Sequence, residues 1–316
     1  MRFVLPGRRA GLGAVAVIAA ALLGAGSNPP APGGDAVIRG KAGPSEIVIT
    51  TTRRVAGAIH SLTWGGVEFL DSADHGRQLQ SASNLDCGER FIPEVFNPTE
   101  AGSAADGAGP TSSSRLLCLR AEGDTLETTT RMAFWLAPGG TSAGHPAYNR
   151  TPLSDHLLTK RVRIGYKDLP HAIAYDVTFT LPAAEHHTLA QFEALTGYMP
   201  PAFTTFLALD PTSGALSPLS DGPGEQTRPV VFSTPDGSHA MGVYSPARPP
   251  AGYGRFRFAA EKVNKWNCVF RVRARAGDGV PPGPYRYRIF VAVGTLEDVR
   301  RTLTALARES GPGTGG

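Results

Sequence analysis

Alternation of apolar and polar residues with a period of two dominates this chain and predicts β-strands. The clearest example is the segment 172–181, whose apolar face carries Ile173, Tyr175, Val177, Phe179 and Leu181. The preceding run, 159–164, is joined to it by a turn, so the two predict an antiparallel hairpin. Further strand-like runs are expected at 47–50, 58–64, 67–70, 115–120, 128–136, 188–195, 229–232, 240–244, 255–258, 267–275 and 285–293.

One segment near the end has helical spacing instead. Thr295 and Asp298 have the spacing of a capping box, which starts a helix. The apolar residues that follow, spaced three and four apart, share one helical face: Leu296, Val299, Leu303 and Leu306. Many strands and one helix predict an all-β fold, a large antiparallel β-sandwich with a short C-terminal helix, formed as a single domain by residues 46–308.

The N-terminal segment is expected to be a secretory signal peptide covering residues 1–26. Arg2, Arg8 and Arg9 precede an apolar run that ends in small residues, and this run is too short to span a bilayer comfortably. An uncleaved N-terminal anchor is the alternative. The Pro- and Gly-rich segment 27–45 is interpreted as a flexible linker, and 309–316 as a disordered tail. We therefore expect a secreted or periplasmic protein with no other association with a membrane.

Charge and cysteine content narrow the function further. Removal of the three signal arginines lowers the formal charge from +4 to about +1, so nothing global indicates binding to nucleic acid. In an oxidising compartment the three cysteines allow one disulfide at most; Cys87 and Cys118 are the nearer pair, but the sequence does not assign it. Phosphate-binding, dinucleotide-binding and nucleophile-elbow motifs are absent, and no cofactor is expected.

A polar stretch, residues 74–102, is the strongest candidate for a functional site. It concentrates an imidazole, a guanidinium, carboxylates and carboxamides in a region with few aliphatic residues. Such groups are costly to bury without partners, so the stretch either lies in solvent as a loop or lines a polar cleft that a ligand completes. We expect the cleft.

Three phrases within the chain carry a resemblance to a known class: D-H-G-R-Q-L-Q at 74–80, N-P-T-E-A-G at 97–102 and K-W-N-C at 265–268. They resemble those of secreted bacterial proteins of the galactose mutarotase-like supersandwich class. Members of that class include sugar epimerases and domains of polysaccharide lyases and glycoside hydrolases. The resemblance implies a carbohydrate ligand on a concave sheet. The mutarotase's own catalytic His and Glu match no motif in this chain, so that activity is not transferred.

If the ligand is a sugar, the candidate catalytic residues are His75, Glu100 and Glu193. Hydrolysis needs two carboxyl groups that flank the scissile bond, with Glu100 as the first and Glu193, Asp86 or Glu94 as its partner. Elimination instead needs a base and a cation, for which His75 and Arg77 fit, with Tyr198 or Tyr148 as the acid. The alternatives are structural: His75 bonded to the backbone and Arg77 paired with Glu100.

The candidate substrate-binding residues are Arg77, Gln78, Gln80, Asn97, Tyr198 and Trp266. Trp266 serves equally well as a core residue or as a stacking platform for a sugar ring. His186 and His187 are adjacent and would point apart on a strand, so we expect a solvated turn there and no metal site.

Arginines alternate with apolar residues in the last three expected strands: Arg255, Arg257, Arg271, Arg273, Arg275, Arg286 and Arg288. If these strands are neighbours, the guanidinium groups form one basic face, which would suit an anionic polymer such as a uronic acid polysaccharide. The favoured alternative is an ordinary solvated face on which the arginine stems cover apolar surface.

Three function classes remain open: a secreted carbohydrate-active enzyme (hydrolase, lyase or epimerase), a non-catalytic carbohydrate-binding protein, and a structural envelope protein. The enzyme is favoured. The sugar, the linkage and the oligomeric state are not determined by the sequence.

Overall fold

The computed structural model describes residues 32–275 and 277–310. The signal peptide expected at 1–26 lies outside the described residues, as does nearly all of the tail expected at 309–316. No helix within the described part of the chain is long and apolar enough to cross a membrane.

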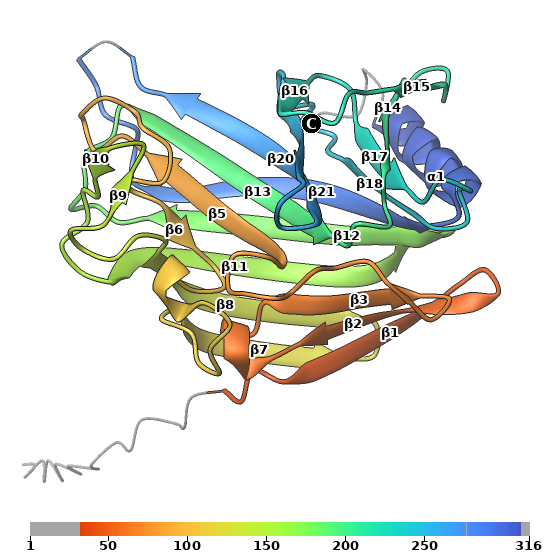
Figure 1. The fold of residues 1–316 in the computed structure, drawn as a ribbon, viewed down its shortest axis with the longest axis horizontal. Coiled ribbons are helices and arrows are strands. Elements are labelled where there is room, and N and C mark those ends of the chain that lie inside the picture. The colour runs from red at the N-terminus through yellow and green to blue at the C-terminus, as the bar shows by residue number, and fades with distance from the viewer. Residues whose placement is uncertain (1–31, 276, 311–316) are drawn as a thin grey trace, which may run out of the picture. The chain divides into compact units, whose positions relative to one another are not determined.

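Antiparallel strands form two curved layers (Figure 1). The first layer follows the pairing order β7 (Arg115–Glu122), β8 (Thr125–Phe134), β11 (Leu153–Tyr166), β12 (Leu169–Leu181), β21 (Gly283–Gly294), β18 (Ala240–Tyr244), β17 (Val230–Ser233), β14 (Thr205–Leu209) and β15 (Leu216–Pro218).

The second layer follows the pairing order β1 (Ala36–Ala42), β2 (Ser45–Thr51), β3 (Ile59–Trp64), β5 (Leu79–Leu85), β13 (Leu189–Met199), β20 (Val263–Arg273), β19 (Tyr253–Phe258) and β16 (Gly224–Gln226). The short elements are β4 (Val67–Glu68), β6 (Pro98–Thr99), β9 (Thr141–Ser142), β10 (His145–Pro146) and the 3₁₀ turns Arg53–Val55 and Ala104–Asp106. Strand β6 pairs with both β5 and β8, so it connects the two layers.

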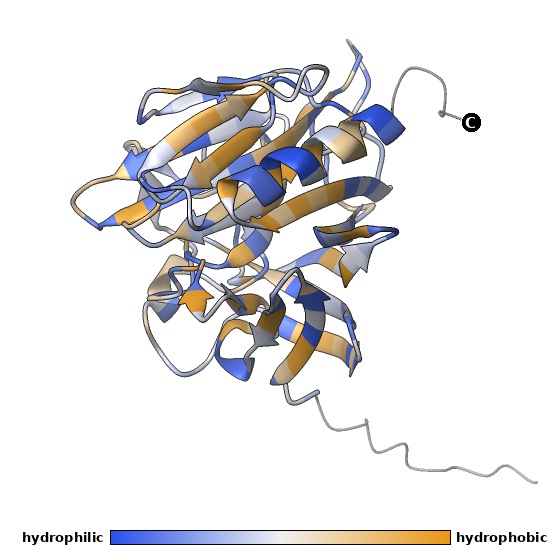
Figure 2. Ribbon diagram, turned by 90° about the vertical axis from the view of Figure 1, so that its right-hand side faces the viewer, coloured by the Kyte–Doolittle hydropathy of each residue, from blue (hydrophilic) through white to orange (hydrophobic). Residues whose placement is uncertain are grey.

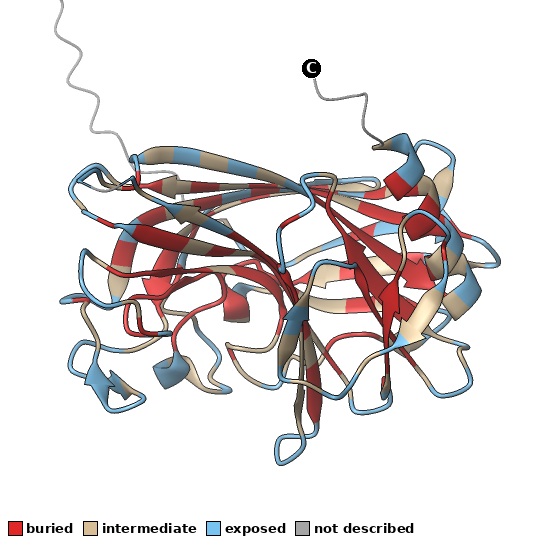
Figure 3. Ribbon diagram, turned by 90° about the horizontal axis from the view of Figure 1, so that it is seen from above, coloured by how far each residue is buried: buried red, intermediate tan, exposed pale blue. Residues whose placement is uncertain are grey.

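The main core lies between the layers, as the buried strand faces in Figure 3 indicate. The rings of Phe179 on β12 and Phe192 on β13 meet across it with centroids 4.9 Å apart, and those of Phe270 on β20 and Tyr287 on β21 meet at 4.2 Å. The residues 173, 175, 177, 179 and 181 of β12 are all buried, as the alternation predicted. The all-β sandwich is therefore confirmed.

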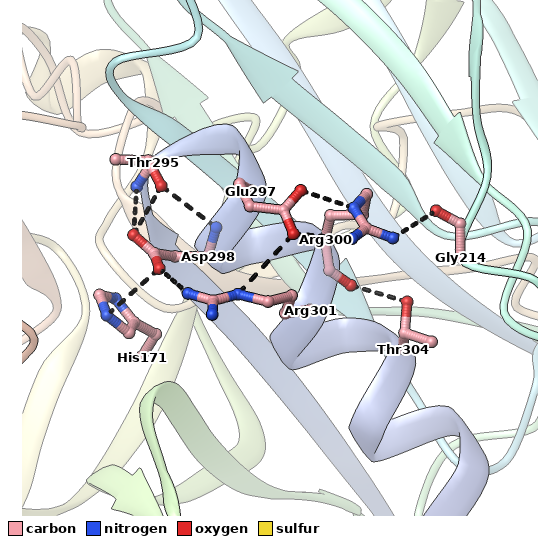
Figure 4. Close-up of polar contacts among 8 residues, drawn as sticks. All are labelled: His171, Gly214, Thr295, Glu297, Asp298, Arg300, Arg301 and Thr304. Carbon is pink, nitrogen blue, oxygen red and sulfur yellow. Dashed lines mark hydrogen bonds and ion pairs between the residues drawn. The ribbon is translucent and has the colours of Figure 1, made fainter.

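The described residues contain one α-helix, α1 (Leu296–Glu309), which covers the outer face of the first layer (Figure 2). The predicted capping box is present: Asp298 N donates to Thr295 Oγ1 at 3.1 Å, and Thr295 N donates to Asp298 Oδ2 at 3.2 Å (Figure 4). Val299, Leu303 and Leu306 are buried against the sheet. A side chain at Gly242 of β18 would place its Cβ 2.7 Å from the Leu303 side chain, so glycine permits this close approach.

The prediction of a flexible linker at 27–45 is wrong from residue 36 onward. Residues 36–42 form β1, which pairs with β2 along its whole length. Ile38 and Ala42 are buried on one face, but the Gly and Pro residues around this segment concealed its short alternation. The folded part accordingly begins before residue 46, and α1 extends it to Glu309.

The interpretation of these arginines as one common basic face is also wrong. Strand β21 pairs with β12 and β18 and is not a neighbour of β19 or β20. Arg255 pairs opposite the buried Trp266, whereas Arg271 pairs opposite Gln191 on the other face of β20. Arg288 forms a bidentate contact with Asp176 at 2.6 and 2.7 Å. Because these arginines lie on opposite faces of the strands and some pair with acidic residues, they form no continuous basic surface. All three cysteines are free thiols, so Cys87 and Cys118 form no disulfide.

We predict that Thr295→Ala lowers the free energy of unfolding by about 1 kcal/mol, because the amide of Asp298 loses its capping acceptor. Urea denaturation followed by circular dichroism measures this. Thr111→Ala, at an exposed loop position, is the matched control and should change stability by less than about 0.5 kcal/mol. Equal stability of the two variants would contradict the capping role.

Candidate functional site: a polar cleft on the outer face of the second layer

A cleft of ≈ 360 Å³ lies over β5, β13, β20 and β19, on the side of these strands that faces away from the core. Strands β5, β13 and β20 run side by side in the upper left of Figure 1. Its lining is rich in carboxamides, carboxylates and hydroxyls: Gln80, Asn84, Glu94, Asn97, Thr99, Gln191, Glu193, Thr196, Tyr198, Glu225, Lys265 and Asn267, with Trp135 and Phe256 as aromatic walls.

Strand alternation separates this polar face from the core. On β5, Gln80 and Asn84 face the cleft, while Leu79 and Leu85 belong to the core. The register places Gln80 opposite Thr196, and Thr196 opposite Asn267, so the three side chains form a row across three strands. The predicted candidates Gln80 and Asn97 thus lie in the cleft lining.

A β-bulge at Ala194 shapes the site. The register of β13 shifts between Glu193 and Leu195 against β20, and between Glu193 and Thr196 against β5. In a regular strand, Glu193 and Tyr198 would point to opposite faces, because they are an odd number of residues apart. The extra residue reverses the alternation, so both line the cleft.

The centre of the cleft is an ionic cluster of Glu193, Lys265 and Tyr198. Lys265 Nζ lies 3.2 Å from Glu193 Oε2, and the two side chains are only 15% and 14% exposed. The same Oε2 accepts hydrogen bonds from Thr196 Oγ1 at 2.9 Å and from Asn267 Nδ2 at 3.4 Å. No contact from the described residues falls on the other oxygen, Oε1, which is not among the buried unpaired atoms. One oxygen of Glu193 is anchored and the other remains available.

Electrostatics fix the protonation of this cluster. Burial raises the pKa of Glu193, but Lys265 and the hydrogen bonds from Thr196 and Asn267 outweigh it and hold the pKa below its ordinary value. Burial opposes the charged ammonium of Lys265, yet Glu193 and Tyr198 raise its pKa overall. Burial also raises the pKa of Tyr198. At neutral pH the cleft therefore holds a carboxylate, an ammonium and a protonated phenol.

Aromatic rings flank the cluster. Lys265 Nζ lies 5.3 Å from the ring centroid of Tyr198 and 5.4 Å from that of Phe256, which are cation–π distances. Trp135 forms another wall and packs against Gly76, where an added Cβ would lie 2.8 Å from the indole ring. Such rings are suitable surfaces for the apolar face of a ligand.

An unpaired polar atom marks the floor. Asn267 is 4% exposed, and its Oδ1 has no hydrogen-bond partner among the described residues. Gly254 on β19 lies directly opposite Asn267, and an added Cβ there would come within 2.2 Å of this oxygen. A buried acceptor without a partner is costly unless a ligand or water completes it.

Trp266 lies outside the cleft. Its side chain is fully buried in the main core, and Gly197 packs so closely that an added Cβ would lie 2.4 Å from the indole. The residues on either side of it, Lys265 and Asn267, face the cleft instead. Sequence reasoning missed these two and Trp135. The signal was present in the K-W-N phrase, because period two allows only Trp266 or its two neighbours to face the cleft.

His75, Arg77 and Gln78 also lie outside the lining. The ring nitrogens of His75 lie 2.7 Å from Gly107 O and 2.7 Å from Arg54 O, and the side chain is 1% exposed. Arg77 pairs with Asp74 at 3.1 Å. Gln78 is fully buried, and its amide donates to Ser72 Oγ and to a backbone carbonyl. These residues hold the turn that precedes β5, since their polar groups are used by the protein itself.

Glu100 is buried between the layers. Its carboxylate lies 2.5 and 2.7 Å from Nζ of Lys160, which is 1% exposed, and it accepts from Ser81 N at 3.0 Å. Glu100 contributes no atom to the cleft lining. Asp86, another candidate carboxyl, is buried and bonded to Thr188. The structure therefore brings together Glu193, Glu94, Tyr198, Gln80 and Asn97 from the predicted set in the cleft lining and leaves His75, Arg77, Gln78, Asp86, Glu100, Tyr148 and Trp266 outside it.

No protein-family model and no curated protein matches this sequence. Among solved structures, the chain is similar to a putative aldose 1-epimerase from Escherichia coli K12, at 11% identity over 83% of this chain and 100% of that one, with a TM-score of 0.50. A galactose mutarotase-like protein from Lactobacillus casei matches at 8% identity over 82% of this chain and 100% of that one, with a TM-score of 0.44. The likeness to the putative aldose 1-epimerase concerns the fold alone.

We predict that Lys160→Met lowers the free energy of unfolding by about 3–5 kcal/mol, because Glu100 would remain buried without its counter-ion. Chemical denaturation measures the loss. The double variant Lys160→Met/Glu100→Gln removes both charges and keeps an acceptor for Ser81 N, so it should be more stable than Lys160→Met alone. A double variant as unstable as the sum of both single variants would show that the ion pair does not couple the two residues.

Proposed function

We propose that this chain is a carbohydrate-active protein that binds a saccharide in the cleft and acts on it by acid–base chemistry. The single observation that carries the proposal is the free Oε1 of Glu193, beside an anchored Oε2 and two donors, in a cleft lined by carboxamides and aromatic rings. Hydroxyl-rich ligands need many donors and acceptors together with an apolar surface for the ring face. The fold shared with a putative aldose 1-epimerase agrees with this ligand class.

Among the possible reactions, epimerisation at the anomeric carbon suits the cleft best. Glu193 Oε1 accepts the proton of the anomeric hydroxyl while Tyr198 or Lys265 donates one to the ring oxygen. The bond between the anomeric carbon and the ring oxygen breaks and a carbonyl forms; rotation and the reverse steps yield the other anomer. Hydrolysis would need a second carboxyl, but Glu225 is paired with Arg271 at 2.7 Å and Glu94 accepts from Ser142 at 3.0 Å.

A second candidate function is saccharide binding without turnover. It is favoured by the low pKa of Glu193, because a carboxylate held ionised by Lys265 is a weak base. In that case the cluster serves only to orient hydroxyl groups, and the cleft acts as a binding surface. Turnover by the intact protein separates the two functions.

We predict that Glu193→Gln lowers the rate of anomeric equilibration of reducing sugars by at least about 100-fold, measured by NMR exchange or polarimetry. Sugar binding, measured by calorimetry, should change only a few-fold. Because the pKa of Glu193 is held below its ordinary value, the wild-type rate should fall on the acid side only at a pH more acid than that at which an ordinary glutamate titrates. Tyr198→Phe, which removes a donor but keeps the ring, should also slow turnover.

The exposed Glu122→Gln is the matched control and should leave the rate unchanged. Release of reducing ends and formation of unsaturated products, assayed in parallel on polysaccharides, report hydrolysis and elimination. Full epimerase activity in Glu193→Gln would refute its role as the base. If the wild type binds the sugar without any turnover, the second candidate function, saccharide binding alone, is supported instead.

We also predict that the ligand is neutral, in contrast to the anionic polymer considered from the sequence. Glu94, Glu193 and Glu225 line the cleft against one lysine, Lys265. A neutral oligosaccharide should therefore bind at least about 10-fold more tightly than the corresponding uronate oligomer of equal length, and added salt should narrow the difference. Isothermal titration calorimetry at two salt concentrations measures both. Tighter binding of the uronate would contradict this assignment.

A further inference from the structure

We propose that His156, Glu185 and His187 form a binding site for a divalent first-row metal ion such as Zn²⁺. The site lies at a second pocket of ≈ 410 Å³, whose lining includes Phe96, Tyr148, Asp155, Glu185 and His187. His156 belongs to β11, whereas Glu185 and His187 lie in the loop between β12 and β13. The proposed reaction in the cleft uses none of these residues.

The three side chains converge on one point. Nε2 of His156 lies 2.6 Å from Oε2 of Glu185, and Nε2 of His187 lies 2.9 Å from the same oxygen. One ligand atom from each residue lies within 4.8 Å of both others. Two imidazoles and one carboxylate are a donor set that zinc takes in proteins, with a remaining position open to water or another small ligand.

The spacing requires only a small adjustment. Around a tetrahedral zinc ion, with bonds of about 2.0–2.1 Å, ligand atoms are about 3.3 Å apart. The two contacts of Glu185 therefore have to lengthen by about half an ångström. Glu185 lies on a loop and its side chain is 23% exposed, so it has room to move. An ion would enter from the pocket, on the side of Glu185.

The surroundings hold both imidazoles in position. Each histidine side chain is 2% exposed. The ring of Phe96 packs against both, with centroid distances of 5.6 Å to His187 and 6.0 Å to His156. Buried rings with fixed orientation are a preorganised half of a metal site.

One contact favours the competing interpretation, a hydrogen-bonded triad without metal. The amide of Cys87 lies 3.3 Å from Nδ1 of His187 and donates to it. An imidazole bound to metal through Nε2 carries its proton on Nδ1, so this long hydrogen bond has to open on binding. Nδ1 of His156 has no such donor among the described residues.

The sequence did not indicate this site. The solvated turn predicted at His186 and His187 is wrong for His187, which is buried, because adjacent residues on an extended chain point apart. The ring of His186 packs instead beside Gly88 and Gly279. The partner of His187 is His156, which the fold supplies from another strand.

Calorimetric titration of the chelator-stripped protein with Zn²⁺ tests the proposal, together with the visible absorption spectrum of the Co²⁺ form. One saturable ion per chain and the intense bands of tetrahedral cobalt are expected. His156→Gln and His187→Gln should each weaken affinity by more than the ~10–100-fold that loss of an outer-shell partner costs. His186→Gln is the matched control and should bind as the wild type does.

Glu185→Gln changes a residue on the partly exposed loop, so it tests the site even if the buried histidine variants misfold. It should also weaken Zn²⁺ binding. Circular dichroism confirms folding of each variant. The absence of saturable Zn²⁺ uptake by the wild type, or uptake that persists in all three variants, would overturn the proposal. Sugar binding is measured with and without chelator to test the cleft independently of the metal site. If the metal proposal fails, sugar binding in the cleft is expected to remain unchanged.

Discussion

The buried contact between Glu100 and Lys160 is the constraint on which the arrangement around the cleft depends. Glu100 follows β6, the short strand that pairs with both layers, and Lys160 comes from the inner face of β11. Removing two charges from water is so costly that each is acceptable only beside the other. The pair therefore fixes where β6 sits, and with it the positions of Asn97 and Thr99 at the edge of the cleft. A residue with the chemistry of a catalytic acid is here part of the framework.

A second constraint is the division of each strand of the second layer into two faces. The inner faces of β13 and β20 carry Phe192, Trp266 and Cys268 into the core, and the outer faces carry the polar cluster. Each cleft side chain on β13 and β20 thus stands on a strand whose other side is packed. This arrangement gives the cluster of Glu193 and Lys265 a rigid base, which acid–base chemistry and selective binding both require.

The segment 93–97 separates the cleft from the proposed metal site. Pro93, Glu94 and Asn97 line the cleft, while Phe96 points to the other pocket and packs on His156 and His187. Side chains of one short segment therefore line two pockets of different chemistry. One pocket offers carboxamides and an ammonium to hydroxyl groups, and the other offers imidazoles and a carboxylate to a cation.

The sequence by itself determined the strands, the capped helix and the fold class, because period-two and helical alternation and a capping box are local patterns. It also indicated Glu193, Tyr198, Gln80 and Asn97 as polar residues on or near strands. Only the tertiary structure decided which polar groups face a ligand. His75 and Glu100 have partners far along the chain, Lys160 among them, and these partners leave no mark on the local pattern. The bulge at Ala194 and the meeting of His156 with His187 likewise arise from strand pairing and loop packing, which join residues that the sequence keeps apart.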